Sequence, residues 1–453
     1  MTEHDQPATV GRDPPTTHTR FALLAYATLA LPLACAALPM YVLLPALYGN
    51  HQGLSLSLLG TVLLLARCAD AVADPLIGWA SDRLHQPRTL ICIGMLLLTT
   101  GMALAFNPPT GSTQHWHWLA LALVPLYAGY SLASINYFSW GAQLHTSIEG
   151  HTRVTSMREA LGLFGVIIAS TLPMLLNETS TATMPRYSVA LAVLFLFGTV
   201  IALRYAPAPT QHRQALHEDP LKATHLCSTQ YTDANTTNVV RLWPLRHPAV
   251  RGLFAAFIVN GIASALPATL VLFFVGDVLQ LQASAGIFLS AYFLAGACSL
   301  PMWQRIARRV GAARAWQWSM LLSIPAFSGA WLLGAGDQLG YLLVCVLSGL
   351  MLGADLALPP ALLAYLIQTH HDQAQTNAYF GWWTFVTKLN LALAAGLSLP
   401  LLQWLGYIPS SQEHIEPLRM AYCFWPCVLK LLAAGVLQQQ RSLRLAHSRF
   451  IDR

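Results

Sequence analysis

The strongest constraint on this chain is a series of long apolar segments. Twelve runs of about 20 residues or more are predominantly apolar, and they occupy residues 21–47, 55–81, 88–107, 117–144, 157–177, 184–205, 251–279, 284–303, 314–335, 338–368, 377–405 and 418–438. About 20 such residues cross the hydrocarbon core of a bilayer as a helix. Only 10% of the residues are charged, whereas about 25% is usual in soluble domains. The sequence therefore predicts an all-α integral membrane protein with twelve transmembrane helices.

A polar segment at residues 206–249 divides these runs into six plus six. We expect an N-terminal tail at 1–20, an N-terminal half at 21–205, a linker at 206–249, a C-terminal half at 250–438 and a C-terminal tail at 439–453. A weak repeat supports the division, because residues 78–83 and 302–311 each lead into a basic turn after the second run of their half. Two six-helix halves are the layout of the major facilitator fold.

The basic residues predict how the chain is oriented in the membrane. The loops after the second, fourth, sixth and eighth runs, together with the two ends, hold Arg12, Arg20, Arg83, Arg88, Arg153, Arg213, Lys222, Arg241, Arg246, Arg305, Arg308, Arg309, Arg441, Arg444, Arg449 and Arg453. The opposite loops hold little beyond Arg186 and Arg419. Positive charge favours the cytoplasmic side, so we expect a multi-pass protein of the inner (plasma) membrane with both termini in the cytoplasm. These basic residues are interpreted as topology signals, and no nucleic-acid partner is expected.

Three ionisable residues lie inside the second apolar run. At about 100° per residue, Arg67, Asp70 and Asp74 share one narrow face with Gly78. Each such residue costs about 2.5 to 3.5 kcal/mol at the bilayer centre, so this face must meet a partner or a wet cavity. An intramembrane charge cluster is therefore a hypothesis for a functional site.

Asp70 and Asp74 are the candidate coupling site for a cation. Carboxylates at positions i and i+4 point in the same direction, where they can coordinate a hard cation or hold a proton. Two like charges in a medium of low dielectric constant are not both ionised cheaply. The alternative is a packing salt bridge in which Arg67 neutralises one carboxylate, although the second carboxylate would then have no explanation.

Lys388 is the expected partner from the other half. It lies near the middle of the eleventh run, too deep to reach either surface easily, so we expect it to meet a carboxylate; a static ion pair between helices is the alternative interpretation. Asp355 in the tenth run is a further intramembrane carboxylate and a candidate cavity residue. Lys430 in the last run is interpreted as an anchor that reaches the cytoplasmic face.

Four other residues are candidates for lining a substrate cavity. Tyr137, Trp140 and Trp383 could stack on a sugar-like ligand, although aromatic side chains at membrane depth more often pack. Arg158 follows a polar stretch at residues 146–153, interpreted as a turn, and either reaches the substrate or marks the cytoplasmic boundary.

No metal site, cofactor or catalytic constellation is predicted. The eight cysteines are scattered without CxxC spacing, and the histidines cluster in tails and loops. An enzyme would need a nucleophile with a base, or a metal constellation, at one membrane face, and a sensor or scaffold would need a large soluble segment. We therefore expect a transporter rather than an enzyme.

The sequence from Arg67 through Asp74 to Gly78 resembles the second-span motif of the glycoside-pentoside-hexuronide:cation symporters, the melibiose-permease-like branch of the major facilitator superfamily. Residues 137–144, followed by Arg153 and Arg158, are similar to the fourth- and fifth-span region of that family, and Lys388 is similar to its eleventh-span lysine. The resemblance covers nearly the whole chain. It implies cation-coupled transport of a small solute by alternating access, with the two aspartates as the cation site.

Departures from the family pattern change what the resemblance implies. Sodium-using members have Asn immediately before the second aspartate, whereas this chain has Ala73, which favours H⁺ over Na⁺ as the coupling ion. The sugar-binding carboxylates of galactoside carriers are missing, because residues 21–47 hold no acidic residue and Ala133 occupies the position in the fourth span. A melibiose-type substrate therefore does not carry over.

The sequence as a whole predicts a cation-coupled symporter of a small solute, sugar-like or related. The expected partners are this solute, a monovalent cation and the bilayer, and the chain is expected to act as a monomer. Two alternatives remain at this stage. A proton-coupled exporter of drugs or metabolites would use the same coupling carboxylates, and a related branch of the family transports lysophospholipids.

Overall fold

The structure is a computed structural model that describes residues 19–41, 43–48, 56–109, 115–176, 184–208, 243–370, 372–407 and 415–440. These residues form helices joined by short turns, and no strand occurs among them. Most of the predicted terminal tails and most of the predicted linker lie outside the described residues.

The first half of the chain forms six helical segments. They are α1 to α3 (Arg20–Ala27, Ala30–Tyr41 and Leu43–Ala46), α4 (Leu56–Leu84), α5 (Pro87–Phe106), α6 (His115–Ala142), α7 (Ile148–Leu175) and α8 (Pro185–Tyr205). The predicted turn at 146–153 was wrong, since α7 begins at Ile148. The Ser147 hydroxyl accepts a hydrogen bond of 3.1 Å from the Gly150 backbone N–H, so Ser147 caps the new helix.

The second half repeats this pattern after the short turn η2 (Trp243–Arg246). Its segments are α11 with η3 (Pro248–Phe273 and Phe274–Val278), η4 and α12 (Gln282–Ser284 and Ala285–Val310), α13 (Ala312–Ala330), α14 (Gln338–Thr369), η5 and α15 (Gln373–Gln375 and Thr376–Trp404), and α16, η6 and α17 (Glu416–Arg419, Met420–Phe424 and Trp425–Gln439). Pro248 occupies the first turn of α11, where its missing N–H costs nothing.

Within the described residues, eight segments are long and apolar enough to cross a membrane. The other long helices, α4, α7, α13 and α15, carry charged or polar side chains, as Lys388 in α15 illustrates. With these four helices the described chain has twelve long helical segments in two halves, the predicted major facilitator fold. Large apolar side chains such as Leu64, Val72 and Leu332 are exposed on the outside of the bundle, as expected for contact with lipid.

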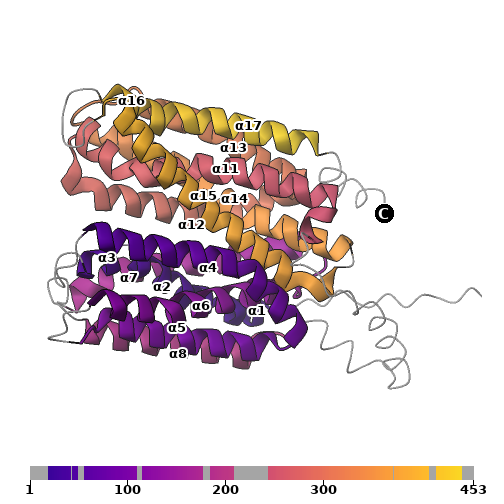
Figure 1. Ribbon diagram of the computed structural model, residues 1–453. Coiled ribbons are helices and arrows are strands. Elements are labelled where there is room, and N and C mark those ends of the chain that lie inside the picture. The colour runs from indigo at the N-terminus through magenta and orange to yellow at the C-terminus, as the bar shows by residue number, and fades with distance from the viewer. Residues whose placement is uncertain are drawn as a thin grey trace, which may run out of the picture.

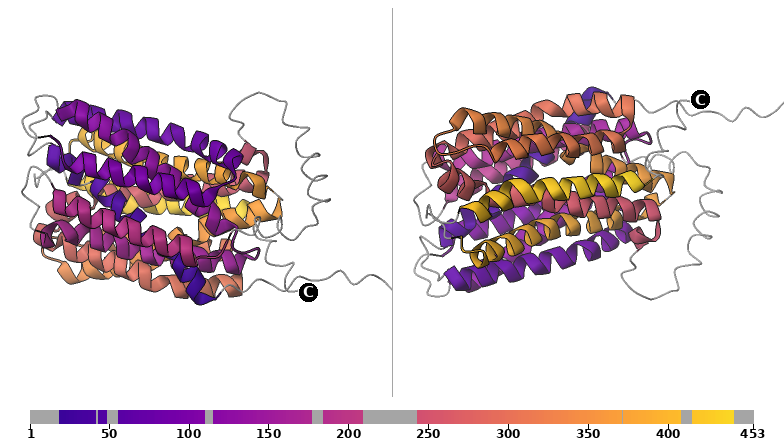
Figure 2. Two further views of the ribbon diagram at one scale, coloured as in Figure 1. Left: turned by 90° about the horizontal axis from the view of Figure 1, so that it is seen from below. Right: turned by 90° about the horizontal axis from the view of Figure 1, so that it is seen from above.

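The two halves lie side by side with their helices roughly along one common axis (Figures 1 and 2). We call the end of the bundle where α8 ends and α11 begins the linker-side end, and the opposite end the far end. The N-terminal half has its own apolar core, whereas a second core at the linker-side end contains Ile135 and Ala142 from α6 together with residues of the C-terminal half. A third core lies at the far end of the C-terminal half.

Candidate functional site

The charged stripe of α4 faces the other half of the molecule. Asp70 and Asp74 lie one turn apart and are buried, with 8% and 0% of their surface exposed. Pro75 follows within the same helix; it has no N–H to donate to the preceding turn. Because unpaired charges are costly in lipid, this face of α4 must pack against a helix that offers an opposite charge. That helix is α15.

Lys388 of α15 binds both carboxylates. Its Nζ lies 2.6 Å from Asp70 Oδ2 and 2.8 Å from Asp74 Oδ2, and it donates a hydrogen bond of 2.9 Å to Asp74 Oδ1. Ser131 of α6 completes the cluster, because its hydroxyl donates to Asp70 Oδ1 at 2.8 Å and accepts from Lys388 Nζ at 2.9 Å. The sequence predicted that Lys388 meets a carboxylate of the other half, and the structure shows this contact.

The cluster is unbalanced in charge. Two carboxylates share one ammonium, so the group of Asp70, Asp74 and Lys388 carries one net negative charge when all three are ionised. Such a charge is expensive inside a membrane, and binding one proton or one monovalent cation would neutralise it. Arg67 lies one turn before Asp70 on α4 and is half-buried, whereas the partner shared by the two aspartates is Lys388.

Ser131 was not singled out from the sequence. A neutral hydroxyl in an apolar run carries little signal, because serine is common in membrane helices, where it can hydrogen-bond to neighbouring helices. The helical spacing of Ser131 and Ser134 from Tyr127 would have placed a polar edge on α6, although not its partner.

Two glycines allow α4 and α15 to approach closely. A Cβ built on Gly381 would lie 2.6 Å from the backbone oxygen of Asp74, and a Cβ on Gly78 would collide with the backbone oxygen of Asn377. These helices pack backbone against backbone, as small residues permit in membrane proteins. The approach brings Lys388 within reach of both aspartates.

We expect Gly381→Ala to destabilise the protein, because the added methyl group meets backbone atoms that cannot rotate away. Overpacking of this kind costs about 1 to 3 kcal/mol. Thermal unfolding of purified protein would show a lowered midpoint. Gly396→Ala on the same helix is the matched control, since its Cβ would meet nothing within 4 Å; equal midpoints for the two variants would contradict the close packing.

Asp82 joins the same two helices at the linker-side end. Its carboxylate accepts backbone N–H groups of Asn377 and Ala378 at 2.9 and 2.8 Å, so a residue of one half caps the first turn of a helix in the other. A carboxylate at a helix N-terminus is favoured by the free N–H groups and by the helix dipole. In the sequence Asp82 belongs to a basic turn, and nothing there predicts this contact.

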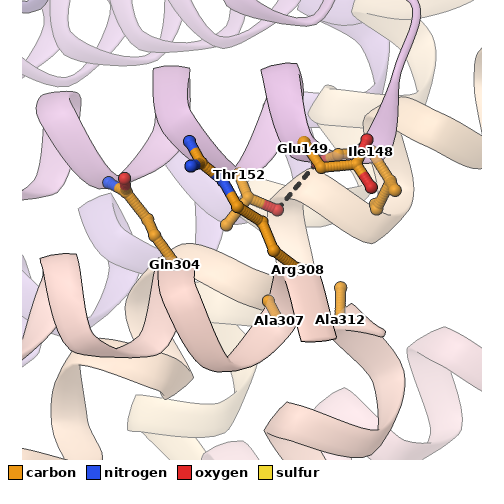
Figure 3. Close-up of a pocket in the computed structure, with 7 residues that line it drawn as sticks. All are labelled: Ile148, Glu149, Thr152, Gln304, Ala307, Arg308 and Ala312. Atoms are coloured by element: carbon orange, nitrogen blue, oxygen red, sulfur yellow. Dashed lines mark hydrogen bonds between the residues drawn. The ribbon is translucent and has the colours of Figure 1, made fainter. Parts of the chain in front are cut away.

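Further contacts close the linker-side end. The Thr155 hydroxyl of α7 donates to the Ala357 carbonyl of α14 at 2.8 Å, and the Gln368 amide donates to the Ala142 carbonyl at 3.3 Å. Figure 3 shows a small pocket between the halves, lined on one side by Ile148, Glu149 and Thr152 of α7 and on the other by Gln304, Ala307 and Arg308 of α12. The two halves are therefore held together at the end where the linker joins them.

The other candidates in the N-terminal half are buried in its interior. Tyr137 and Trp140 are fully buried in its apolar core, and the Trp140 indole donates to the Pro207 carbonyl at 2.9 Å. Arg158 is 4% exposed, pairs with Glu159 at 2.7 Å and lies 4.2 Å from the Phe138 ring centroid. Arg158 was interpreted either as a substrate contact or as a marker of the cytoplasmic boundary. A residue that only marks the boundary would be exposed, whereas Arg158 is buried and ion-paired.

The C-terminal half contains a second buried ion pair, between Asp355 and Lys430. Lys430 Nζ lies 2.6 Å from Asp355 Oδ2 and donates to Ser264 at 2.9 Å, and the Trp316 indole donates to Asp355 Oδ1 at 2.9 Å. The interpretation of Lys430 as a surface anchor was wrong, since only 3% of it is exposed. Its helix turns Lys430 inward, where a carboxylate offers a better partner than a distant headgroup.

Asp355 lines a cavity, as predicted, and this cavity lies within the C-terminal half. Trp383 is 6% exposed and stacks on Phe257 with 3.7 Å between ring centroids. Phe257 lines the same cavity, so Trp383 supports its wall from behind.

Solved structures resemble this fold at low sequence identity. A bacterial homologue of the iron transporter ferroportin has a TM-score of 0.68 at 14% identity, with 94% of this chain and 100% of that chain covered. The transporter FucP has a TM-score of 0.62 at 15% identity, with 93% and 98% covered. The proton:xylose symporter XylE has a TM-score of 0.59 at 14% identity, with 92% and 94% covered. These likenesses support the fold.

A family model described as MFS/sugar transport protein matches residues 23–439. This match covers nearly the whole chain, including α4, α6 and α15, which form the cluster of Asp70, Asp74, Ser131 and Lys388. The chain therefore belongs to this family, that of the melibiose-permease-like glycoside-pentoside-hexuronide symporters within the major facilitator superfamily.

Proposed function

We propose that this protein is a proton-coupled secondary symporter of a small solute, sugar-like or related. The observation that carries the proposal is the bridge made by Lys388, whose single ammonium group binds both Asp70 and Asp74 of the other half. The family description and the sugar symporters among the similar structures support the transport of a solute of this class.

The proposed mechanism uses competition between the cation and Lys388. When both aspartates are ionised, Lys388 bridges the halves and α15 stays against α4. A proton on one carboxylate removes part of the attraction for Lys388, which frees α15 to move relative to α4. Because a bound proton can only favour the state that binds it more tightly, the energy of the proton gradient biases one conformation over the other.

The oxygen atoms around the cluster favour a proton over sodium. A hard metal cation takes several oxygen ligands, and here these are the carboxylate oxygens of Asp70 and Asp74 together with the Ser131 hydroxyl. Ala73 offers no side-chain oxygen. A proton needs one carboxylate only, so we propose H⁺ as the coupling ion and Na⁺ as the alternative.

We also propose that the linker-side end faces the cytoplasm of a cell whose inner membrane holds the protein. Arg83, Arg153, Arg305, Arg308 and Arg309 lie at this end, and positive charge favours the cytoplasmic side. With its linker-side contacts formed, the molecule is then closed toward the cytoplasm. Three of the similar structures are described as being in an outward-facing state or an outward conformation, which supports this assignment.

The coupling is tested by the double variant Asp70→Asn, Asp74→Asn in vesicles. A panel of radiolabelled sugars, glycosides and organic acids is first screened for accumulation under an imposed pH gradient, and the accumulated solute is then followed. We expect the double variant to lose accumulation while still exchanging the solute down its own gradient, because amides bind no proton at neutral pH. Solute-induced alkalinisation of the medium should disappear with it.

Asp277→Asn is the matched control, because this carboxylate lies at the far end, where it accepts a hydrogen bond from the Tyr407 hydroxyl. Proton-coupled accumulation that survives in the double variant would refute the assignment of Asp70 and Asp74. Stimulation by sodium without a pH gradient would select the sodium version of the same site.

A further inference from the structure

The C-terminal half contains a partly open cavity of about 460 Å³. Its walls come from α11 to α15, η6 and α17, so every residue that lines it belongs to this half. The volume falls within the range of about 300 to 1,000 Å³ that is typical of small-molecule sites. The cavity is distinct from the cluster of Asp70, Asp74 and Lys388, none of which lines it.

The walls of the cavity carry both polar and aromatic side chains. The polar ones are Asn260 and Ser264 on α11, Ser323 on α13, Ser348 and Asp355 on α14, Thr387 and Asn390 on α15, and Lys430 on α17, and Asn260, Ser264, Asp355 and Asn390 lie near the middle of their helices. Toward the far end the walls become aromatic with Phe288, Tyr341 and Tyr422, and the two tyrosine hydroxyls bond to each other at 2.7 Å. This gradient fits an amphipathic molecule whose polar end points to the middle of the membrane.

We call the part of the cavity wall formed by Asn260, Ser264, Asp355, Asn390 and Lys430 the polar floor. It carries no net charge. Asp355 and Lys430 neutralise each other, and Ser264 and Trp316 supply further hydrogen bonds to the pair. Because both charges are already matched and bonded, the floor does not require a charged ligand. A neutral polar group is the better complement.

Two buried amide oxygens on this floor have no partner among the described residues. Asn260 and Asn390 are 2% and 4% exposed, and the Oδ1 atom of each makes no hydrogen bond. The Asn390 amide nitrogen donates to the Phe257 carbonyl at 3.3 Å, which fixes the orientation of this side chain. A buried acceptor without a donor is costly. Because Asn260 and Asn390 both line the cavity, a bound molecule whose hydrogen-bond donors reach these oxygens would remove that cost.

We propose that this cavity is a binding site for a neutral amphipathic solute, with an apolar ring or short chain against the aromatic walls and a hydroxyl-bearing end on Asn260 and Asn390. The site goes beyond the coupling function, because it needs neither Asp70 nor Asp74. Helix α15 separates the two sites: Thr387 and Asn390 face the cavity, whereas Lys388 faces α4.

The test is equilibrium binding of 2-naphthyl β-D-glucoside to the full chain in lipid nanodiscs, corrected for partition into empty nanodiscs. This probe joins an apolar double ring to a hydroxyl-rich end. We expect saturable binding of the glucoside, and we expect the affinity for glucose alone to be at least 10-fold lower. Ala265→Trp, which fills the cavity from α11, should weaken binding by 10-fold or more. Asn260→Leu should weaken it by about 3- to 10-fold, the worth of one hydrogen bond.

Ala255→Trp is the matched control, because Ala255 is an exposed residue of the same helix and does not line the cavity. Thermal unfolding without the probe checks that each variant is folded. The site would be refuted by binding no stronger than partition into empty nanodiscs, or by equal binding to the Ala265→Trp and Ala255→Trp variants. Because no gradient is used, this result is independent of whether Asp70 and Asp74 couple transport to protons.

Discussion

Lys388→Met is expected to destabilise the protein by about 3 to 5 kcal/mol at pH 8 and to abolish coupled transport. Removing one partner of a buried ion pair leaves an uncompensated charge, and Lys388 is the ammonium that Asp70 and Asp74 share. Methionine keeps much of the length of the lysine side chain, so the loss reflects charge rather than volume. Thermal or denaturant unfolding in one detergent at several pH values measures the effect.

The pH dependence of this variant has a definite sign. Without the ammonium, the folded state gains by binding protons at the two carboxylates, and an unfolded chain gains less. Stability of Lys388→Met should therefore increase as the pH falls from 8 toward 5, relative to the unchanged protein. A variant whose stability does not depend on pH in this range would show that the carboxylates are solvated rather than held in the interior.

A charge-neutral triple variant is the control for the charge argument. Lys388→Met combined with Asp70→Asn and Asp74→Asn removes the ammonium and both carboxylates, so we expect it to recover most of the lost stability. Coupled accumulation should remain absent, because no proton site is left. Failure to recover stability would mean that Lys388 holds the helices by packing or by its bond to Ser131 rather than by charge.

The sequence was most informative where burial of charge left few possibilities. Asp70 and Asp74 lie inside an apolar run and required a partner, and Lys388 lies too deep for its ammonium to reach water. The free-energy cost of unpaired charges in the membrane therefore predicted that these residues meet across the halves. Lys430 differs, because its position in the sequence lies within reach of the cytoplasmic face and so did not require a buried partner. The side on which a helix turns such a residue depends on packing, which the sequence does not display.

The surroundings of uncharged residues could not be predicted from the sequence. Ser131 is inexpensive in a membrane helix, so nothing about its position required a partner. Tyr137 and Trp140 were candidates for a cavity, and the structure places them in the packed core of the N-terminal half. A position in an apolar helix gives the residue type and the depth, whereas the facing element comes only from the three-dimensional packing.

Asp82→Ala is expected to open the linker-side end. The carboxylate of Asp82 accepts two backbone N–H groups of α15, and hydrogen bonds to a charged group are worth about 1.5 to 3 kcal/mol. These bonds exist only while the halves are closed at this end, so their loss acts on one conformation and not on the other. The population that is open at the linker-side end should rise about 10- to 100-fold.

A cysteine at Thr152 reports this opening, in a chain whose natural cysteines are replaced by serine. Thr152 is 3% exposed and lines the small pocket between α7 and α12 at the linker-side end, so a maleimide reaches it only when the halves separate there. We expect the labelling rate to rise with Asp82→Ala in proportion to the open population. Asp337→Ala is the control, because Asp337 accepts the Gly334 N–H at the far end without joining the halves. Equal labelling rates for the two variants would show that the cap on α15 does not hold the linker-side end closed, and the bridge at Lys388 would then have to do so alone.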